Sequence, residues 1–469
     1  MFSYENLGQT FSIMDKDQIF VLSGLTLFAL GIGAFIIWGP NSSPARRGGV
    51  IGLQNLGLTC FLNTLLQAMA SCAIFVEWLE SCHGQGPVAS ALYYLLKVLS
   101  TEPAKLPEGI EEPLAPSGFI QALRGHGWSI GFGEQDAHEL FHLIMATLEE
   151  EAHKTSANEG SLTDALEPKR RNSTGDVEES HKSSGDKGEP QSLPPVLKFL
   201  SYRLVNKQGE PITRKILPKY DSNKNCQASP FCGLLTSQLQ CVDCGFKSVV
   251  RYDKFDSLSL HLPEMGSGFL QPITLAHLLD RFTQTESVNG VVCEGCNNNR
   301  APDQPPITTT SLKTLSIGKL PRCLCIHIHR ISMDKHGSPY KRPDYVDFPE
   351  YLCMDPYTQN SIIKEQKLKE DVKPDGDETA ECSTPKSLPC RMGSYNHIYR
   401  VKAVVVHRGS VHNGHFVTYR RGPLQSSTRH RSDRWYLTSD ESVTSATLAG
   451  AMEANAYMLF YEKCSMTPT

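Results

Sequence analysis

The chain has 469 residues, of which 40% are hydrophobic and 20% charged, and its formal net charge is −4. This length suits one large domain or two of medium size, and so small an acidic excess excludes a chain built for nucleic acid. The 15 cysteines are too sparse for a secreted disulfide scaffold, which favours a reducing compartment and metal or catalytic uses for some thiols.

The first predicted element is a membrane anchor at 19–39, which follows a short tail at 1–18. Residues 19–38 carry no charge, and a helix of 20 such residues crosses a hydrocarbon core of ~30 Å. A buried core helix is the alternative interpretation. A cleaved signal peptide fits poorly, because its apolar region would be shorter and its start basic. Arg46 and Arg47 follow the span, so the positive-inside rule places the rest of the chain in the cytosol.

After a linker at 40–49, the composition predicts one long folded domain at 50–465. Two inserts, at about 151–195 and 358–394, are rich in Lys, Glu, Ser or Asp and are predicted to be disordered, because they offer little apolar surface to bury. Segments before the first insert have mainly helical patterns, and segments after it have strand patterns, for example at 324–329. An α+β protein with a helical lobe before a sheet lobe is therefore expected.

A nucleophile is predicted at Cys60. Apolar residues recur at helical spacing from Leu62 to Met69, so Cys60 lies in the first turn of an amphipathic helix that Thr59 can cap. The dipole and the free N–H groups of a helix N-terminus stabilise a thiolate, the form in which cysteine attacks. Asn55, five residues upstream, is placed to donate its amide to the oxyanion of an acyl intermediate. A structural cysteine that begins a core helix fits the local pattern equally well.

The stretch 52–67, GLQNLGLTCFLNTLLQ, resembles the Cys box of the ubiquitin-specific proteases, G-L-x-N-L-G-N-T-C-[YF]-x-N-[SAT]-x-L-Q. It departs from that pattern at Leu58, where asparagine is usual. The resemblance extends over roughly 49–462 apart from the inserts. It implies a papain-like α+β fold of thumb, palm and fingers with a zinc ribbon, preceded by the single transmembrane helix. It also implies a thiol protease that hydrolyses the (iso)peptide bond after the C-terminal glycine of ubiquitin, with Cys60 as nucleophile.

The string GEQDAHEL at 133–140 is predicted to open a second amphipathic helix, and acidic residues in a first turn stabilise a helix by themselves. The string also resembles the family motif Q-[QE]-D-[AS]-x-E-[FL], whose acids help to hold the arginine-containing tail of ubiquitin. That resemblance implies a substrate-binding role for Asp136. For Glu139 it leaves substrate binding and helix stabilisation equally open.

Two C-x-x-C pairs, Cys241 with Cys244 and Cys293 with Cys296, predict a structural zinc site. Four thiolates suit a tetrahedral zinc ion with no open position, so catalysis at the metal is not expected. Four unrelated buried cysteines are the alternative. In the family such a ribbon, here at about 232–300, closes the tips of the fingers that grip ubiquitin, which implies that loss of zinc loosens substrate binding.

The general base is predicted at His415. Residues 399–406 are β-branched and apolar, as in a buried central strand, and they lead into a polar turn. Gly414 permits close approach of a substrate backbone, and the strand after it holds His415 in place. The segment resembles the family box H-x-G-x4-G-H-[YF], whose second histidine is the base. This leaves His407 and His412 as loop residues.

Ser439 is predicted to orient the base, at a position where most relatives carry an acid or amide. The family string W-Y-x-F-[DN]-D is Trp-Tyr-Leu-Thr-Ser-Asp at 435–440 of this chain. A hydroxyl can accept the Nδ1–H bond of the imidazole, but it stabilises the imidazolium less than a carboxylate, so slow turnover is expected. Asp440 is the alternative orienting residue.

Within the family, an N-terminal anchor joined to a serine-containing triad most resembles the member of the mitochondrial outer membrane, which trims ubiquitin from mitochondrial surface proteins and opposes mitophagy. The resemblance implies a single-pass protein whose partners are ubiquitin, ubiquitinated membrane proteins and the lipid bilayer. Hydropathy alone leaves the endoplasmic reticulum open as its location. Two rival functions remain: a catalytically silent membrane-anchored ubiquitin-binding module, and a membrane scaffold.

Overall fold

The computed structural model describes residues 49–464 apart from 83, 107–111, 129–134, 159–227, 265–271, 299, 302–303, 365–395, 412 and 424–433. The predicted anchor at 19–39 lies outside these residues. Within them, no single helix is both long and apolar enough to cross a membrane; α3 (Cys60–Ala70) and α4 (Ala73–Cys82) pass that test only together, with a bend of 96° between them.

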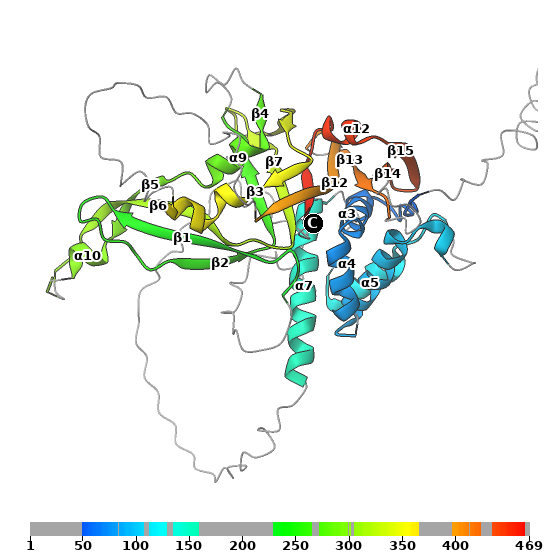
Figure 1. Ribbon diagram of the computed structural model, residues 1–469, viewed down its shortest axis with the longest axis horizontal. Coiled ribbons are helices and arrows are strands. Elements are labelled where there is room, and N and C mark those ends of the chain that lie inside the picture. The colour runs from blue at the N-terminus through cyan, green and yellow to red at the C-terminus, as the bar shows by residue number, and fades with distance from the viewer. Residues whose placement is uncertain are drawn as a thin grey trace, which may run out of the picture. The chain divides into compact units, whose positions relative to one another are not determined.

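The part of the chain before the first insert is helical, as predicted. Besides α3 and α4 it contains α5 (Pro87–Ser100), a 3₁₀ turn (Pro103–Lys105), α6 (Ser117–His126) and α7 (Ala137–Asn158). Leu62, Leu65 and Leu66 of α3 are completely buried, and each contributes about 1.5–3 kcal/mol to the free energy of folding. Figure 1 shows α7 with α4 and α5 on one side of it and β1 (Gly233–Cys241) and β2 (Arg251–Phe255) on the other.

Among the described residues, eight strands form the largest sheet, seven of them in the order β15-β14-β13-β12-β16-β7-β3. Their bounds are β3 (Ser257–His261), β7 (Cys323–His329), β12 (Ile398–Gly409), β13 (Gly414–Arg421), β14 (Trp435–Ser439), β15 (Ser442–Ala446) and β16 (Met458–Lys463), and β11 (Tyr351–Cys353) adds to β12. The predicted central strand at 399–406 is confirmed, because β12 lies between β13 and β16 and its side chains there are mostly buried.

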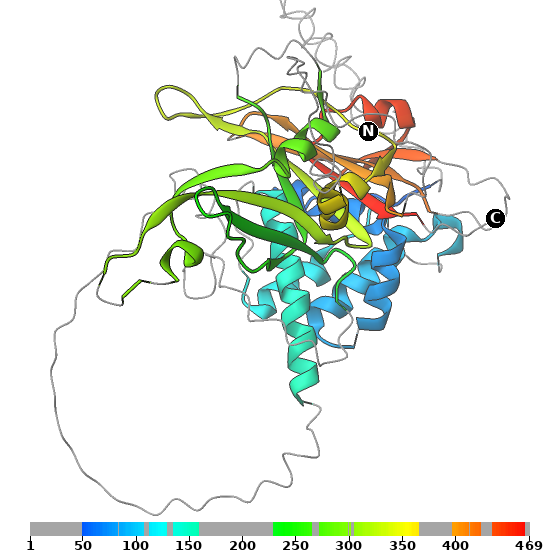
Figure 2. The same ribbon diagram turned by 60° about the vertical axis from the view of Figure 1, so that its left-hand side comes forward.

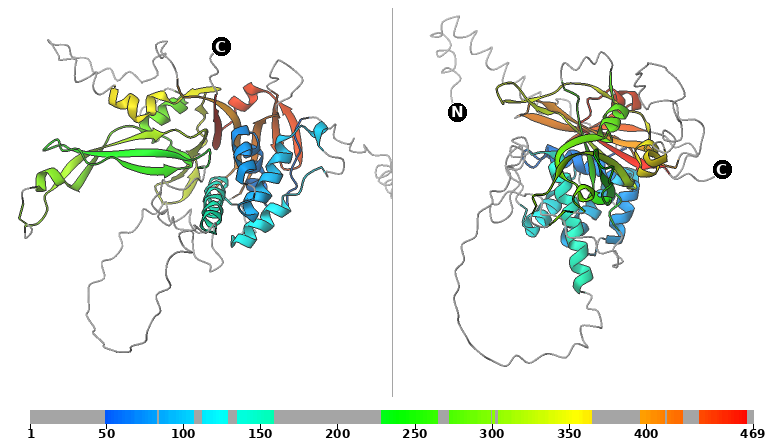
Figure 3. Two further views of the ribbon diagram at one scale, coloured as in Figure 1. Left: turned by 60° about the horizontal axis from the view of Figure 1, so that its bottom comes forward. Right: turned by 90° about the vertical axis from the view of Figure 1, so that its left-hand side faces the viewer.

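The large sheet has a hydrophobic core on each face. One core contains α3 to α7 and includes Phe416 and Phe460 of the sheet. The other packs α9 (Leu275–Phe282) and α12 (Leu448–Met452) against residues such as Val404 and Leu459. Adjacent side chains on a strand point to opposite faces, so Val404 and Val405 of β12 enter different cores. Figure 3 shows the helical lobe on one side of this sheet.

In the described part of the chain, four strands form a second sheet in the order β2-β1-β6-β5. Its strands are β1 (Gly233–Cys241), β2 (Arg251–Phe255), β5 (Glu286–Val292) and β6 (Thr308–Lys319), with α10 (Glu294–Asn297) beside its tip. Two short pairs complete the sheets: β4 (Ile273–Thr274) with β10 (Val346–Asp347), and β8 (Ile331–Met333) with β9 (Pro339–Lys341). A second 3₁₀ turn is Asp355–Tyr357. Figures 1 and 2 show the four-stranded sheet reaching away from the helical lobe, as the expected fingers do.

The predicted starts of both inserts are wrong. α7 continues through the beginning of the first insert to Asn158, and Glu151 is buried. Its carboxylate accepts bonds from the Val88 and Ala89 amides at 3.0 and 2.8 Å, which satisfies the free N–H groups of the first turn of α5. The second insert starts with helical residues at 359–364, next to a bridge between Thr358 and Ile317. Composition fails here because the required partners lie far away in sequence.

Candidate active site

Cys60 is the first residue of α3 and is 5% exposed. The carbonyl of Thr59 accepts the Leu62 and Asn63 amides at 3.0 and 2.9 Å, which starts the helix. The predicted side-chain cap is wrong, because the Thr59 hydroxyl makes no bond to the helix. Instead it accepts the Leu56 amide at 3.0 Å and lies 3.3 Å from Asn55 Oδ1. Thr59 therefore stabilises the loop before Cys60 rather than the helix after it.

Asn55 is fixed at both ends of its side-chain amide. Its Oδ1 accepts bonds from the Gly57 and Thr59 amides, both at 3.1 Å. Its Nδ2 donates to Asp440 Oδ2 at 2.8 Å, which occupies one of the two Nδ2 hydrogens. Asn55 is exposed.

Asp440 joins the C-terminal part of the sheet to the loop before Cys60. Besides the bond from Asn55, its Oδ1 accepts Asn63 Nδ2 at 2.8 Å, and its carbonyl accepts the Leu53 amide at 2.9 Å. Asp440 has φ of 49°, a backbone conformation that aspartate tolerates better than most residues. The sequence predicts Asp440 only as an alternative orienting residue for His415, and no local pattern indicates its bonds to Asn55 and Asn63.

His415 is the second residue of β13, and its Nε2 lies 2.7 Å from Ser439 Oγ at the end of β14. The expected contact through Nδ1 is therefore wrong for this arrangement: the bond to Ser439 uses Nε2, which leaves Nδ1 for a second partner. α3 is attached to β13 through Thr418, whose hydroxyl donates to the Thr64 carbonyl at 2.9 Å. The helix that carries Cys60 and the strand that carries His415 are thus packed together.

His407 lies in β12 and not in a loop, so its predicted position is wrong; His412 lies outside the described residues. The ring of His407 stacks on Phe416 with centroids 4.5 Å apart. Burial, and then the nearby Lys341, lower the pKa of His407 to about 4, so the ring is neutral near pH 7. A Cβ on Gly414 would lie 2.1 Å from His407 Nε2, which explains the glycine beside His415 by packing within the protein.

Leu58, where the chain departs from the family pattern, has φ of 56° and is 47% exposed. This left-handed conformation costs an L-residue with a bulky side chain roughly 1 kcal/mol, and asparagine adopts it more easily. We expect Leu58→Asn to raise the free energy of unfolding by about 1 kcal/mol in urea denaturation. Leu56→Asn is the matched control, because Leu56 is 44% exposed and has a negative φ. Equal effects of the two changes would contradict the explanation by backbone strain.

Asp136 precedes α7 and is engaged within the protein. Its Oδ1 accepts the His138 amide at 2.6 Å, which caps the helix, and its Oδ2 accepts the hydroxyl of Tyr457 at 2.5 Å. Tyr457 is buried beside β16 and was not recognised from the sequence. Glu139 lies in the first turn of α7 and is half-buried. These bonds give Asp136 a structural role at the start of α7.

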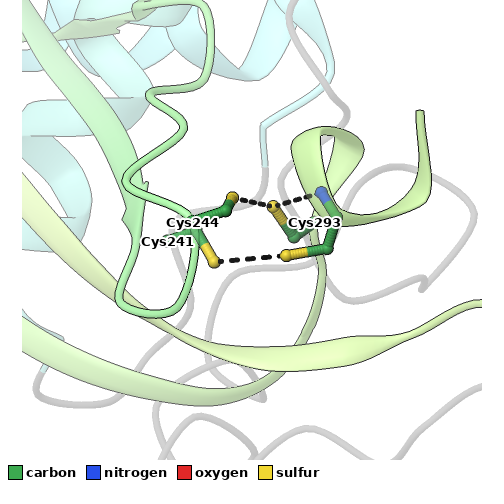
Figure 4. A group of neighbouring side chains, drawn as sticks. Cys241, Cys244 and Cys293 are labelled. Atoms are coloured by element: carbon green, nitrogen blue, oxygen red, sulfur yellow. Dashed lines mark hydrogen bonds between the residues drawn. The ribbon is translucent and has the colours of Figure 1, made fainter. Parts of the chain in front are cut away.

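The four cysteines of the two C-x-x-C pairs meet at the tip of the four-stranded sheet. Figure 4 shows Cys241, Cys244 and Cys293 converging. The Sγ atoms of Cys241 and Cys296 are 3.9 Å apart, those of Cys244 and Cys293 are 3.5 Å apart, and all four lie within 4.8 Å of one another. Four sulfur atoms at these separations fit a tetrahedral zinc ion with Zn–S bonds of about 2.3 Å. The chemistry and spacing of this donor set therefore suit the expected structural metal.

The sequence of this chain is similar to those of known proteins. Residues 51–461 match the family model described as ubiquitin carboxyl-terminal hydrolase. The chain is 35% identical to ubiquitin carboxyl-terminal hydrolase 30 of Xenopus tropicalis, over 93% of this chain and 85% of that protein. It is 33% identical to the protein of the same name from Homo sapiens, over 94% of this chain and 90% of the relative.

Solved structures are similar to this chain in fold. A chain of the SAGA Ubp8/Sgf11/Sus1/Sgf73 DUB module bound to ubiquitin aldehyde gives a TM-score of 0.54 at 21% identity, over 91% of this chain and 72% of that one. The C146A form of the module bound to monoubiquitin gives a TM-score of 0.52 at 20% identity, over 92% of this chain and 75% of that one. The expected mixed helix-and-sheet fold with a zinc-ribbon-like cysteine group is confirmed.

Proposed function

Since the chain belongs to the ubiquitin carboxyl-terminal hydrolase family and is a cysteine-type deubiquitinase, we propose that it removes ubiquitin from proteins of the mitochondrial outer membrane and thereby opposes mitophagy. The observation that carries its chemistry is the 2.7 Å contact between His415 and Ser439 on a strand packed against the helix of Cys60. The location is supported by the similarity to the hydrolase 30 proteins and by the apolar run at 19–38.

In the proposed mechanism, Cys60 is the nucleophile and His415 the base. Ser439 holds the imidazole through Nε2, so Nδ1 takes the proton of the Cys60 thiol. The thiolate attacks the carbonyl carbon after the C-terminal glycine of ubiquitin, and the negative charge moves to the carbonyl oxygen. The free Nδ2 hydrogen of Asn55 stabilises that oxyanion.

The intermediate then collapses and the scissile C–N bond breaks. His415 returns its proton to the leaving amine, which is a lysine side chain for an isopeptide or a main-chain amine for a peptide. A water molecule, deprotonated by His415, attacks the remaining thioester and releases ubiquitin with a free carboxylate. Ser439 is neutral and supports the imidazolium less than a carboxylate does, so the rate of both proton transfers is expected to be low for the family.

Two groups of residues serve substrate binding in this proposal. Asp136, Glu139 and Gly414 lie along the path of the ubiquitin tail, and the carboxylates would attract its arginines. The four cysteines at 241, 244, 293 and 296 hold a structural zinc ion, which fixes the tip of the fingers against the body of ubiquitin. Residues 19–39 anchor the catalytic domain on the cytosolic face of the membrane, with the endoplasmic reticulum as the alternative location.

The decisive test uses ubiquitin with an electrophile at its C-terminus and follows the mass of the protein. A covalent adduct is expected for the wild type and for Cys353→Ser, whose thiol is partly exposed outside the site. No adduct is expected for Cys60→Ser. A wild type without adduct would instead favour a silent ubiquitin-binding module or scaffold. An adduct that persists in Cys60→Ser would reject Cys60 as nucleophile.

A further inference from the structure

A second cluster of metal-binding side chains lies at the start of α7, among residues to which the proposed mechanism gives no role. His138 and His142 are one helical turn apart, and their Nε2 atoms are 3.1 Å from each other. Ser257, the first residue of β3, places its Oγ 2.7 Å from His138 Nε2 and 3.1 Å from His142 Nε2. Three atoms that can bind a metal therefore form a closed triangle between a helix and a strand.

The sequence at this place is His-Glu-Leu-Phe-His at 138–142, which matches the pattern H-E-x-x-H. On a helix this spacing brings two imidazoles to one face, where they can chelate one ion. The arrival of Ser257 from β3, with its Oγ close to both Nε2 atoms, is independent of the pattern.

Hydrogen-bond counting shows that the triangle is one hydrogen short. Its three contacts need three hydrogens between the atoms. The Ser257 hydroxyl supplies one, and only one neutral imidazole can supply another, because two N–H groups would otherwise face each other. A cation at the centre would remove the deficit by accepting a lone pair from each corner.

We propose that His138, His142 and Ser257 form a second metal site, which binds a divalent transition-metal ion, zinc foremost, with water completing the coordination. Imidazole nitrogen suits zinc, nickel and copper. Zn–N bonds of about 2.0–2.1 Å in a tetrahedron put the ligand atoms roughly 3.3 Å apart, so the observed triangle has to open only slightly.

The surroundings hold this site in place. The ring of His327 stacks on His138 with centroids 3.9 Å apart, which prevents the His138 ring from turning away. Ser257 lies in β3, which pairs in parallel with β7 from Ser257 to His261. Ligands held before the ion arrives lose little entropy on binding. The nitrogen and oxygen donors also distinguish this site from the group of four cysteines, and the hydrolytic reaction stays with Cys60.

The site is tested by metal binding to the full-length chain. The protein is first given one equivalent of Zn²⁺, freed of excess metal by buffer exchange and then titrated with Co²⁺ at pH 7.5. We expect one further ion per chain, with an absorption spectrum that lacks the charge-transfer band of cobalt bound to thiolate. In His142→Gln the affinity for this ion should fall at least about tenfold. Ser257→Ala removes only a hydroxyl and should weaken binding less.

His153→Gln is the matched control, because His153 lies on the same helix with a side chain 59% exposed and should leave Co²⁺ binding unchanged. Unchanged thermal unfolding of each variant without added metal checks that the fold is intact. If His142→Gln is unstable, Ser257→Ala takes its place in the Co²⁺ titration. The wild type should then also unfold at a higher temperature with Co²⁺, and a chelator should reverse that rise. The proposal is overturned if the wild type binds no second ion. It is also overturned if His142→Gln binds the second ion as tightly as the wild type does.

Discussion

Asp440→Ala is expected to lower kcat for a ubiquitin-derived substrate by about 10²–10³-fold, with little change in KM. The carboxylate of Asp440 accepts bonds from Asn55 and Asn63, both at 2.8 Å, and removing it leaves the two amides without that acceptor. Asn55 would then no longer be held where the oxyanion forms, and loss of one oxyanion donor costs about this factor. Steady-state hydrolysis of ubiquitin carrying a C-terminal fluorophore measures the effect.

Two further variants show whether this explanation is right. Glu441→Ala changes the neighbouring exposed acid and should keep normal kcat. Ser439→Ala is the informative comparison, because losing the partner of His415 Nε2 changes the pH dependence of kcat, whereas losing Asp440 lowers kcat at every pH. If Asp440→Ala keeps full activity, the bonds between Asp440 and the loop before Cys60 have no catalytic importance.

Much of the fold could be predicted because its signals are local. The helical repeat after Cys60, the apolar strand at 399–406 and the two C-x-x-C pairs each occupy a short stretch of sequence. Periodicity and metal-ligand spacing are properties of such stretches, so they can be recognised without knowing the rest of the structure. The structure confirms the helix of Cys60 and the strand β12, and it places the four cysteines together.

The hydrogen-bond partners of the polar side chains could not be predicted from such local patterns. Asn55 bonds to Asp440, 385 residues away in sequence, and no local pattern distinguishes that bond from one to solvent. The same applies to Glu151, which the composition assigns to a disordered insert although it satisfies the start of α5. The choice of Nε2 at His415 depends on where β14 places Ser439, which is a property of the sheet.

Cys244→Ser is expected to raise KM for ubiquitin substrates about tenfold or more while the reactivity of Cys60 toward a small alkylating agent stays unchanged. The four-stranded sheet has exposed apolar residues near its tip, among them Val242, Val249 and Val292. With these apolar side chains exposed, a zinc ion held by the four cysteines would contribute much of the order of the tip. The thiol of Cys60 is on α3, whose hydrophobic core does not include the four cysteines.

Two further measurements and a control variant decide this prediction. Metal analysis of the purified wild type should give zinc bound at the four cysteines, which Cys244→Ser loses. Limited proteolysis should cut the variant within 241–307 sooner than the wild type, because the strands there lose their link. Cys232→Ser, which changes a thiol at the base of the same sheet, should behave as wild type in both. A wild type that contains no zinc but has a normal KM would contradict the prediction that zinc orders the tip. If loss of zinc also slowed the alkylation of Cys60, the tip and α3 would be coupled.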